Sequence, residues 1–155
     1  MPGQQKSKQE RRSYTSQLID HMLIERNQLL SLLLRVSDLE RGEQNESDGE
    51  VLEEFCQVLV DYIAAGHFGL YDRIIKKTER RKKVADLALR IYPGIDKTTQ
   101  TALIFNEKYE PGKGERSRSE LHLDLSKLGE ELATRIELED QLIGCLKNPL
   151  DAAPN

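Results

Sequence analysis

Residues 53–74 read EEFCQVLVDYIAAGHFGLYDRI, and this stretch decides the fold. Its apolar side chains recur at the i, i+3, i+4, i+7 spacing of one helix face, which predicts a helix over Glu50–Ala65. The apolar residues of that face are Leu52, Phe55, Cys56, Leu59, Tyr62 and Ile63. Gly66 stands where a C-terminal helix cap belongs, yet helical spacing resumes directly after it. We therefore predict two helices joined at a glycine corner, the second running from His67 to about Thr78.

A second stripe follows the opposite side of the same helix. It mixes apolar, small and acidic residues: Val51, Glu54, Val58, Asp61, Ala64, Ala65 and then Phe68. Small residues let a partner helix approach closely, an aromatic residue can anchor it, and a lone acid can fix its orientation. The stripe therefore fits a partner-binding surface. The alternative is a helix at the centre of a bundle that is buried on both sides.

The remaining chain predicts further helices separated by turn signals. Their expected ranges are Ser13 or Thr15 to about Ser37, Lys82–Tyr92, Ile95–Lys108 and about Glu120–Lys147. The acidic stretch Glu40–Gly49, the dipeptide Pro93-Gly94 and the segment Pro111–Ser119 are expected to interrupt them. No stretch alternates with period two for long enough to form a strand. We predict an all-α protein, an antiparallel four-helix bundle with additional short helices.

Length and composition place this bundle in one domain. With 155 residues, 37% hydrophobic and 32% charged, the chain can bury one core beneath a well-solvated surface. We expect a disordered N-terminal tail over residues 1–12, a single helical-bundle domain over 13–148 and a loose C-terminal tail over 149–155. No apolar run approaches the roughly 20 residues of a membrane span, and the first residues lack a signal-peptide core. We therefore expect a cytoplasmic protein that does not bind membranes.

Charge is unevenly distributed along the chain. Residues 36–61 contain nine acidic side chains and one basic one, whereas residues 73–83 contain seven basic side chains and one acidic one. This separation indicates a polar partner of complementary charge. The net charge of −4 argues against nucleic acid as the main partner. The basic run Lys76–Lys83 is interpreted as a solvated helix face, with an acidic partner as its alternative.

Glu139 interrupts the apolar stripe of the last helix and therefore needs a buried partner. Arg135 lies one turn earlier, and Asp20, Arg26 and His67 are candidates from other helices. We predict a buried polar network of these five residues that fixes the register of the helices. The alternative is a helical metal-binding or small-molecule enzyme built around Glu139, His67 and Asp20.

Motifs for catalysis or metal binding are missing from the sequence. A di-metal bundle uses paired Glu-x-x-His motifs, and this chain has three histidines and none in that motif. Cys56 and Cys145 lie far apart, without metal-ligand spacing, and we expect both to be reduced. There is neither a Gly-x-Ser-x-Gly motif nor a phosphate-binding loop. We expect a protein that is not an enzyme and has no cofactor or metal.

Three segments carry a resemblance to a known family. They are the run from Phe55 through Asp61-Tyr62 and Ala65-Gly66-His67-Phe68 to Tyr71, the run Leu18-Ile19-Asp20 to Leu30, and the run Leu128-Gly129-Glu130 to Ile143. In this order they resemble the Rsd/AlgQ family of bacterial anti-sigma regulators, and together they cover most of the chain. The Ala-Gly-His-Phe run is the most specific of them.

The resemblance implies a function that composition and periodicity do not supply. Similar proteins bind the C-terminal domain of the primary sigma factor, which recognises the promoter −35 element, and sequester sigma from core RNA polymerase. It implies a monomer in a 1:1 complex, with no direct contact to nucleic acid. The family's sigma-binding surface includes the positions that match Asp61, Ala64 and Phe68, and relatives can carry Ser at position 64. We expect Asp61 to contribute charge complementarity, Phe68 an apolar anchor, and His67 either a contact or a structural cap.

Overall fold

The computed structural model describes residues 2–39, 46–71, 82–109 and 118–147. Every one of these residues is helical, which confirms the predicted all-α bundle for the part of the chain described. The elements are α1 (Pro2–Leu39), α2 (Glu46–Gly66), the π-helix η1 (His67–Tyr71), α4 (Lys82–Tyr109) and α5 (Arg118–Lys147). Three predicted features lie wholly or mostly outside the described residues: residues 111–117 of the segment Pro111–Ser119, most of the basic run and the C-terminal tail. Arg118 and Ser119 of that segment instead begin α5.

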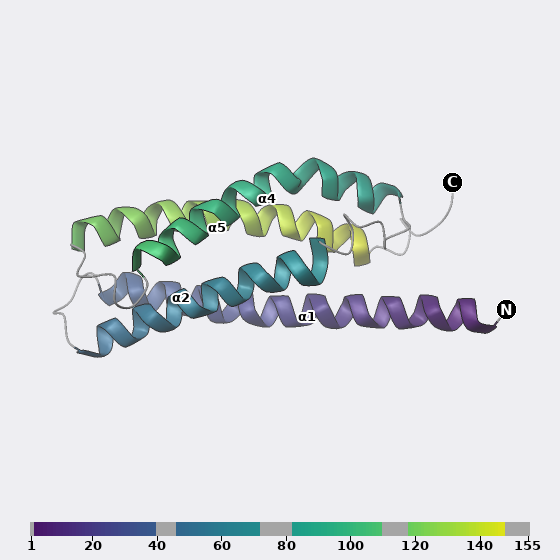
Figure 1. The fold of residues 1–155 in the computed structure, drawn as a ribbon, viewed down its shortest axis with the longest axis horizontal. Helices are drawn as coiled ribbons and strands as arrows, with labels where there is room; N and C mark the ends of the chain where they lie inside the picture. Colours follow the sequence, from purple (N-terminus) through teal and green to yellow (C-terminus); the bar gives the residue numbers. More distant parts are fainter. Residues whose placement is uncertain (1, 40–45, 72–81, 110–117, 148–155) are drawn as a thin grey trace.

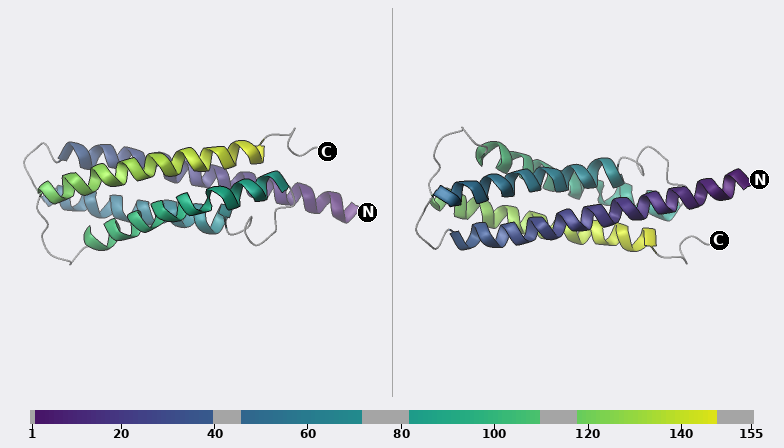
Figure 2. Two further views of the ribbon diagram at one scale, coloured as in Figure 1. Left: turned by 90° about the horizontal axis from the view of Figure 1, so that it is seen from above. Right: turned by 90° about the horizontal axis from the view of Figure 1, so that it is seen from below.

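Two antiparallel helical hairpins form the bundle. Helix α1 packs along α2, and α4 packs along α5; α2 and α4 join the two pairs. Successive long helices run in opposite directions, and the N-terminal end of α1 projects beyond the other helices (Figure 1). The same projection is visible in both views of Figure 2.

The core is built from the apolar stripes that all four long helices turn inward. Helix α2 contributes Phe55, Leu59 and Tyr62, all fully buried, and the Phe55 ring meets Phe105 of α4 edge to face at 5.8 Å. Five further apolar side chains are each at most 1% exposed: Met22, Leu29, Leu128, Leu132 and Leu142. Helix α2 is therefore the central element through which the two hairpins share one core.

Two helices begin earlier than the sequence predicted. Helix α1 starts at Pro2, whereas a disordered tail is expected over residues 1–12. Proline suits the first turn of a helix, and the Gln, Lys, Glu and Arg residues that follow are good helix formers. Helix α2 starts at Glu46, within the stretch predicted as an acidic loop.

The predicted break at Pro93-Gly94 is also wrong. Pro93 lies inside the continuous helix α4, which changes direction along its length in Figure 1. Proline removes one backbone donor and bends a helix, but Ile91 and Ile95 on either side of it are both buried. A Cβ atom on Gly94 would lie 2.9 Å from Leu138 Cδ1, so the glycine allows α5 to pack closely here. Tertiary packing therefore holds the helix together across the proline.

Gly66 is not the corner that its sequence position suggested. The backbone stays helical through it and changes from α to π geometry at His67. A Cβ atom at this position would lie 3.1 Å from Glu139 Oε2 and 3.3 Å from Arg135 Nη2. Glycine lets these charged groups approach the backbone closely, and a larger residue would require them to shift by a few tenths of an ångström.

Candidate functional site

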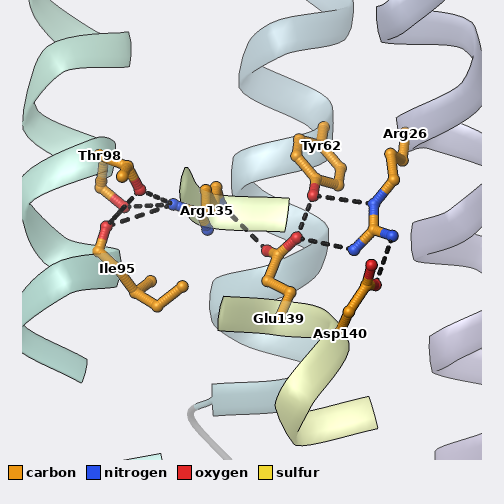
Figure 3. Close-up of polar contacts among 8 residues, drawn as sticks. Arg26, Tyr62, Ile95, Thr98, Arg135, Glu139 and Asp140 are labelled. Carbon is orange, nitrogen blue, oxygen red and sulfur yellow. Dashed lines mark hydrogen bonds and ion pairs between the residues drawn. The ribbon is translucent and has the colours of Figure 1, made fainter. Parts of the chain in front are cut away.

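A buried polar network centres on the carboxylate of Glu139, which is fully buried on α5. Arg26 of α1 donates from Nη2 to Glu139 Oε1 at 3.1 Å, and Arg135 donates from Nε to Glu139 Oε2 at 3.0 Å. The Tyr62 hydroxyl of α2 also donates to Oε1. Figure 3 shows these side chains converging on the carboxylate from three helices. Such pairing offsets the cost of removing a charge from water.

Arg26 uses its remaining donors on two further partners. Its Nε donates to the Tyr62 hydroxyl at 3.2 Å, and Nη1 donates to Asp140 Oδ1 at 2.7 Å. Burial alone would lower the pKa of Arg26, but Tyr62, Asp140 and Glu139 together raise it above its ordinary value. Burial, and then the adjacent charge of Glu139, likewise raise the pKa of Tyr62. The arginine therefore stays charged and the tyrosine stays neutral.

Arg135 extends the network to α4. Its Nη1 atom lies 2.8 Å from Thr99 Oγ1, 3.1 Å from Thr98 Oγ1 and 3.4 Å from the carbonyl oxygen of Ile95. Both threonine hydroxyls donate to that same carbonyl. Because the network draws side chains or backbone from α1, α2, α4 and α5, sliding any long helix along its axis would break at least one bond.

The chemistry of the network indicates a structural role. Both oxygens of Glu139 already accept hydrogen bonds, from two guanidinium groups and a hydroxyl, so the carboxylate has little capacity left for a metal ion. Within residues 2–39, 46–71, 82–109 and 118–147, no group of three His, Cys, Asp or Glu side chains could hold a metal ion.

The structure brings together three of the five residues expected in the network: Arg26, Arg135 and Glu139. Asp20 is exposed, so its inclusion is corrected, and Asp140 supplies the second acid. His67 is half-buried, and its ring packs edge-on against Phe68 at 4.8 Å.

Sequence reasoning also missed Tyr62, Thr98 and Thr99 as members. Tyr62 was counted only as a core residue. Its hydroxyl needs a partner when buried, and that requirement was the available signal.

Three of the seven residues of the second stripe are exposed. Glu54 and Asp61 are exposed, Ala64 and Ala65 are half-buried, and Phe68 is 68% exposed. Gln57, between the two acids, donates to Asp61 Oδ1 at 3.1 Å. Val51 is 9% exposed and Val58 5% exposed, so both belong to the core and their placement on the partner-binding surface is corrected. Four side chains therefore form an exposed ridge, Glu54, Gln57, Asp61 and Phe68, which we call the α2 ridge.

The comparisons with known proteins identify the family. A family model described as "Regulator of RNA polymerase sigma(70) subunit, Rsd/AlgQ" matches residues 1–147. The chain belongs to the Rsd/AlgQ family. This family consists of regulators of the sigma(70) subunit, so the Rsd/AlgQ protein described here is a transcription regulator and not an enzyme.

Individual relatives of this Rsd/AlgQ protein agree with that assignment. "Regulator of sigma D" of Yersinia enterocolitica is 38% identical over 134 residues, covering 83% of this chain and 80% of the relative. The protein of the same name from Shigella dysenteriae is 33% identical over 132 residues, covering 83% of each chain. No solved structure matches the chain significantly. Among the described helices, none is long and apolar enough to cross a membrane.

Proposed function

We propose that this protein binds the C-terminal, −35-recognising domain of the primary sigma factor and sequesters it from core RNA polymerase. The complex is 1:1, and the protein itself does not contact nucleic acid. Sigma is thereby withheld from promoters, which leaves polymerase to alternative sigma factors. The proposal rests on membership of a family of sigma(70) regulators together with the chemistry of the α2 ridge.

Phe68 is the observation that carries the proposal. It is a large aromatic side chain with 68% of its surface exposed, at the end of the helix that forms the centre of the core. Exposing a phenylalanine forgoes the stabilisation that burying it would give, whereas aromatic side chains commonly anchor protein interfaces. A partner that covers the Phe68 ring recovers this burial.

Acidic side chains of α2, two of them in the α2 ridge, indicate a partner of positive charge. Glu50, Glu53, Glu54 and Asp61 are all exposed on α2, and Asp61 lies on the side of the helix that leads to Phe68. A domain that reads the −35 element presents a basic helix-turn-helix surface to phosphates and base edges. Opposite charges of this kind steer association and fix the orientation of the complex.

Titration calorimetry with the isolated C-terminal domain of the primary sigma factor tests the proposal. It should be run at about 0.05 M and 0.3 M salt, because added salt screens exposed charges. We expect saturable 1:1 binding that weakens at the higher salt concentration. Absence of heat and of co-elution, with both partners folded, would contradict the proposal.

Variants of the ridge test its residues. We expect Asp61→Ala and Phe68→Ala each to weaken binding by about 1–4 kcal/mol, as the loss of interface anchors does. Leu123→Ala on α5 is the matched control for Phe68, because Leu123 is 67% exposed. Asp96→Ala, at an exposed position of α4, is the control for Asp61. Equal losses in the variants and their controls would show that the ridge is not the binding surface.

A further inference from the structure

The segment that carries Phe68 is held at both of its ends, against the buried network at Gly66 and in the core at Tyr71. It begins after Gly66, continues as the π-helix His67–Tyr71 and reaches a fully buried residue at Tyr71. Single π turns in proteins are rare and occur frequently at functional sites. Here the π turn itself carries the exposed Phe68 ring and begins next to the network.

Gly66 forms the first attachment. The Arg135 and Glu139 side chains lie so close to its Cα that a Cβ would be 3.3 Å from Arg135 Nη2 and 3.1 Å from Glu139 Oε2. The same Cβ would also lie 3.6 Å from Sδ of Met22 on α1. The backbone at Gly66, immediately before His67, therefore packs directly against the Arg135–Glu139 ion pair.

Tyr71 holds the other end by burial and not by hydrogen bonding, because its buried hydroxyl has no hydrogen-bond partner among the described residues. In a regular α-helix, five residues advance about 500°, which would place residue 71 about 140° from residue 66 around the axis. The wider π turn, with its i to i+5 spacing, returns Tyr71 to the buried side of the helix. The Tyr71 ring is fully buried there, and its pKa is raised by burial and by the nearby charge of Glu139. Both ends of the π turn are therefore buried in the core, and the first of them lies against the Arg135–Glu139 pair.

We infer that Arg135 and Glu139 are positioning residues for sigma binding: they hold the π turn so that Phe68 is presented at the end of the α2 ridge. Neither residue touches a partner, because both are fully buried. They act through Gly66 and the backbone of His67–Tyr71. This inference rests on the proposed function, and it predicts that a change within the network alters binding only through Phe68.

A double-mutant cycle provides the test of this coupling. Gly66→Ala adds one methyl group against the ion pair, and we expect it to weaken binding of the sigma domain about tenfold. In a Phe68→Ala background, the same change should have no further effect on affinity. Gly144→Ala is the matched control, since a Cβ there meets nothing within 4 Å and should leave affinity unchanged. Equal losses from Gly66→Ala with and without Phe68 would overturn the inference.

A second variant covers the case in which Gly66→Ala does not fold. Arg135→Lys keeps the positive charge and removes the Nη2 atom that lies against Gly66. It should show the same coupling to Phe68 from a position on a different helix. Additive losses in this second cycle would also overturn the inference.

Fluorine NMR reports the position of Phe68 without sigma. The chain has three phenylalanines, and Phe55 and Phe105 are buried, so a 4-fluorophenylalanine label gives one solvent-exposed resonance. Arg135→Lys should shift that resonance, and Gly144→Ala should not. An unchanged Phe68 resonance in Arg135→Lys would contradict the inference. The proposed function would still be supported if wild-type protein binds the sigma domain and Phe68→Ala weakens that binding. Failure of wild-type protein to bind the sigma domain would instead count against the proposed function.

Discussion

Replacing Glu139 by Gln removes the central negative charge of the network while preserving its shape. The fully buried Arg135 then has no carboxylate partner, although Arg26 keeps Asp140 at 2.7 Å. Breaking a buried ion pair by removing one partner costs about 3–5 kcal/mol. We expect a loss of about 3 kcal/mol in the free energy of unfolding, at the lower end because glutamine keeps an acceptor oxygen. For a domain of this size that loss lowers the melting temperature by roughly 6–12 °C.

Urea denaturation followed by circular dichroism measures this loss, with Glu130→Gln as the control at an exposed position of the same helix. The control should change the free energy of unfolding by less than about 0.5 kcal/mol. Combining Glu139→Gln with Arg135→Met removes the unpaired cation, so the double variant should lose less than the two single variants summed. A loss below about 1 kcal/mol in Glu139→Gln would refute the view that its charge neutralises Arg135.

Three further predictions follow from burial and charge. Val58→Asp should lower the free energy of unfolding by more than about 3 kcal/mol, because it places an unpaired charge in the core; a change under about 0.5 kcal/mol, roughly that of a surface position, would mean that Val58 is exposed, as the second stripe predicted. Phe68→Ala should leave the urea midpoint nearly unchanged, since the ring is 68% exposed; a large shift would mean that the ring is part of the core. Asp124 is partly exposed, and although burial would raise its pKa, hydrogen bonds from Lys108 and Tyr109 lower it below the ordinary 3.8. This carboxylate therefore adds stability above pH 3.8, which is lost as the pH falls through its lower pKa in the folded state. Asp124→Asn should therefore flatten the acid side of a plot of unfolding free energy against pH, and plots parallel to that of wild type would contradict this.

Periodicity in the sequence was enough to predict the class of fold. The 3.6-residue recurrence of apolar side chains fixes which face of each helix is buried, and helices with one apolar face must pack against one another. The same pattern marked Glu139 as an anomaly within an apolar stripe that needs a buried partner, and it named Arg135, one turn earlier, as a candidate. These predictions depend only on neighbours within one helix, and a single sequence contains that information.

Tertiary structure decided the features that depend on which helices meet. Arg26 and Glu139 are separated by 113 positions, and no local pattern shows that Asp140, not Asp20, completes their pairing. Pro93 and Gly66 carry local signals for helix ends, but packing against α5 keeps the chain helical through both. Val58 lies on the polar side of a two-sided stripe and is nevertheless buried, because α2 is central in the bundle. Local propensity is worth at most a few kcal/mol at any one position, and burial and close packing across helices outweigh it.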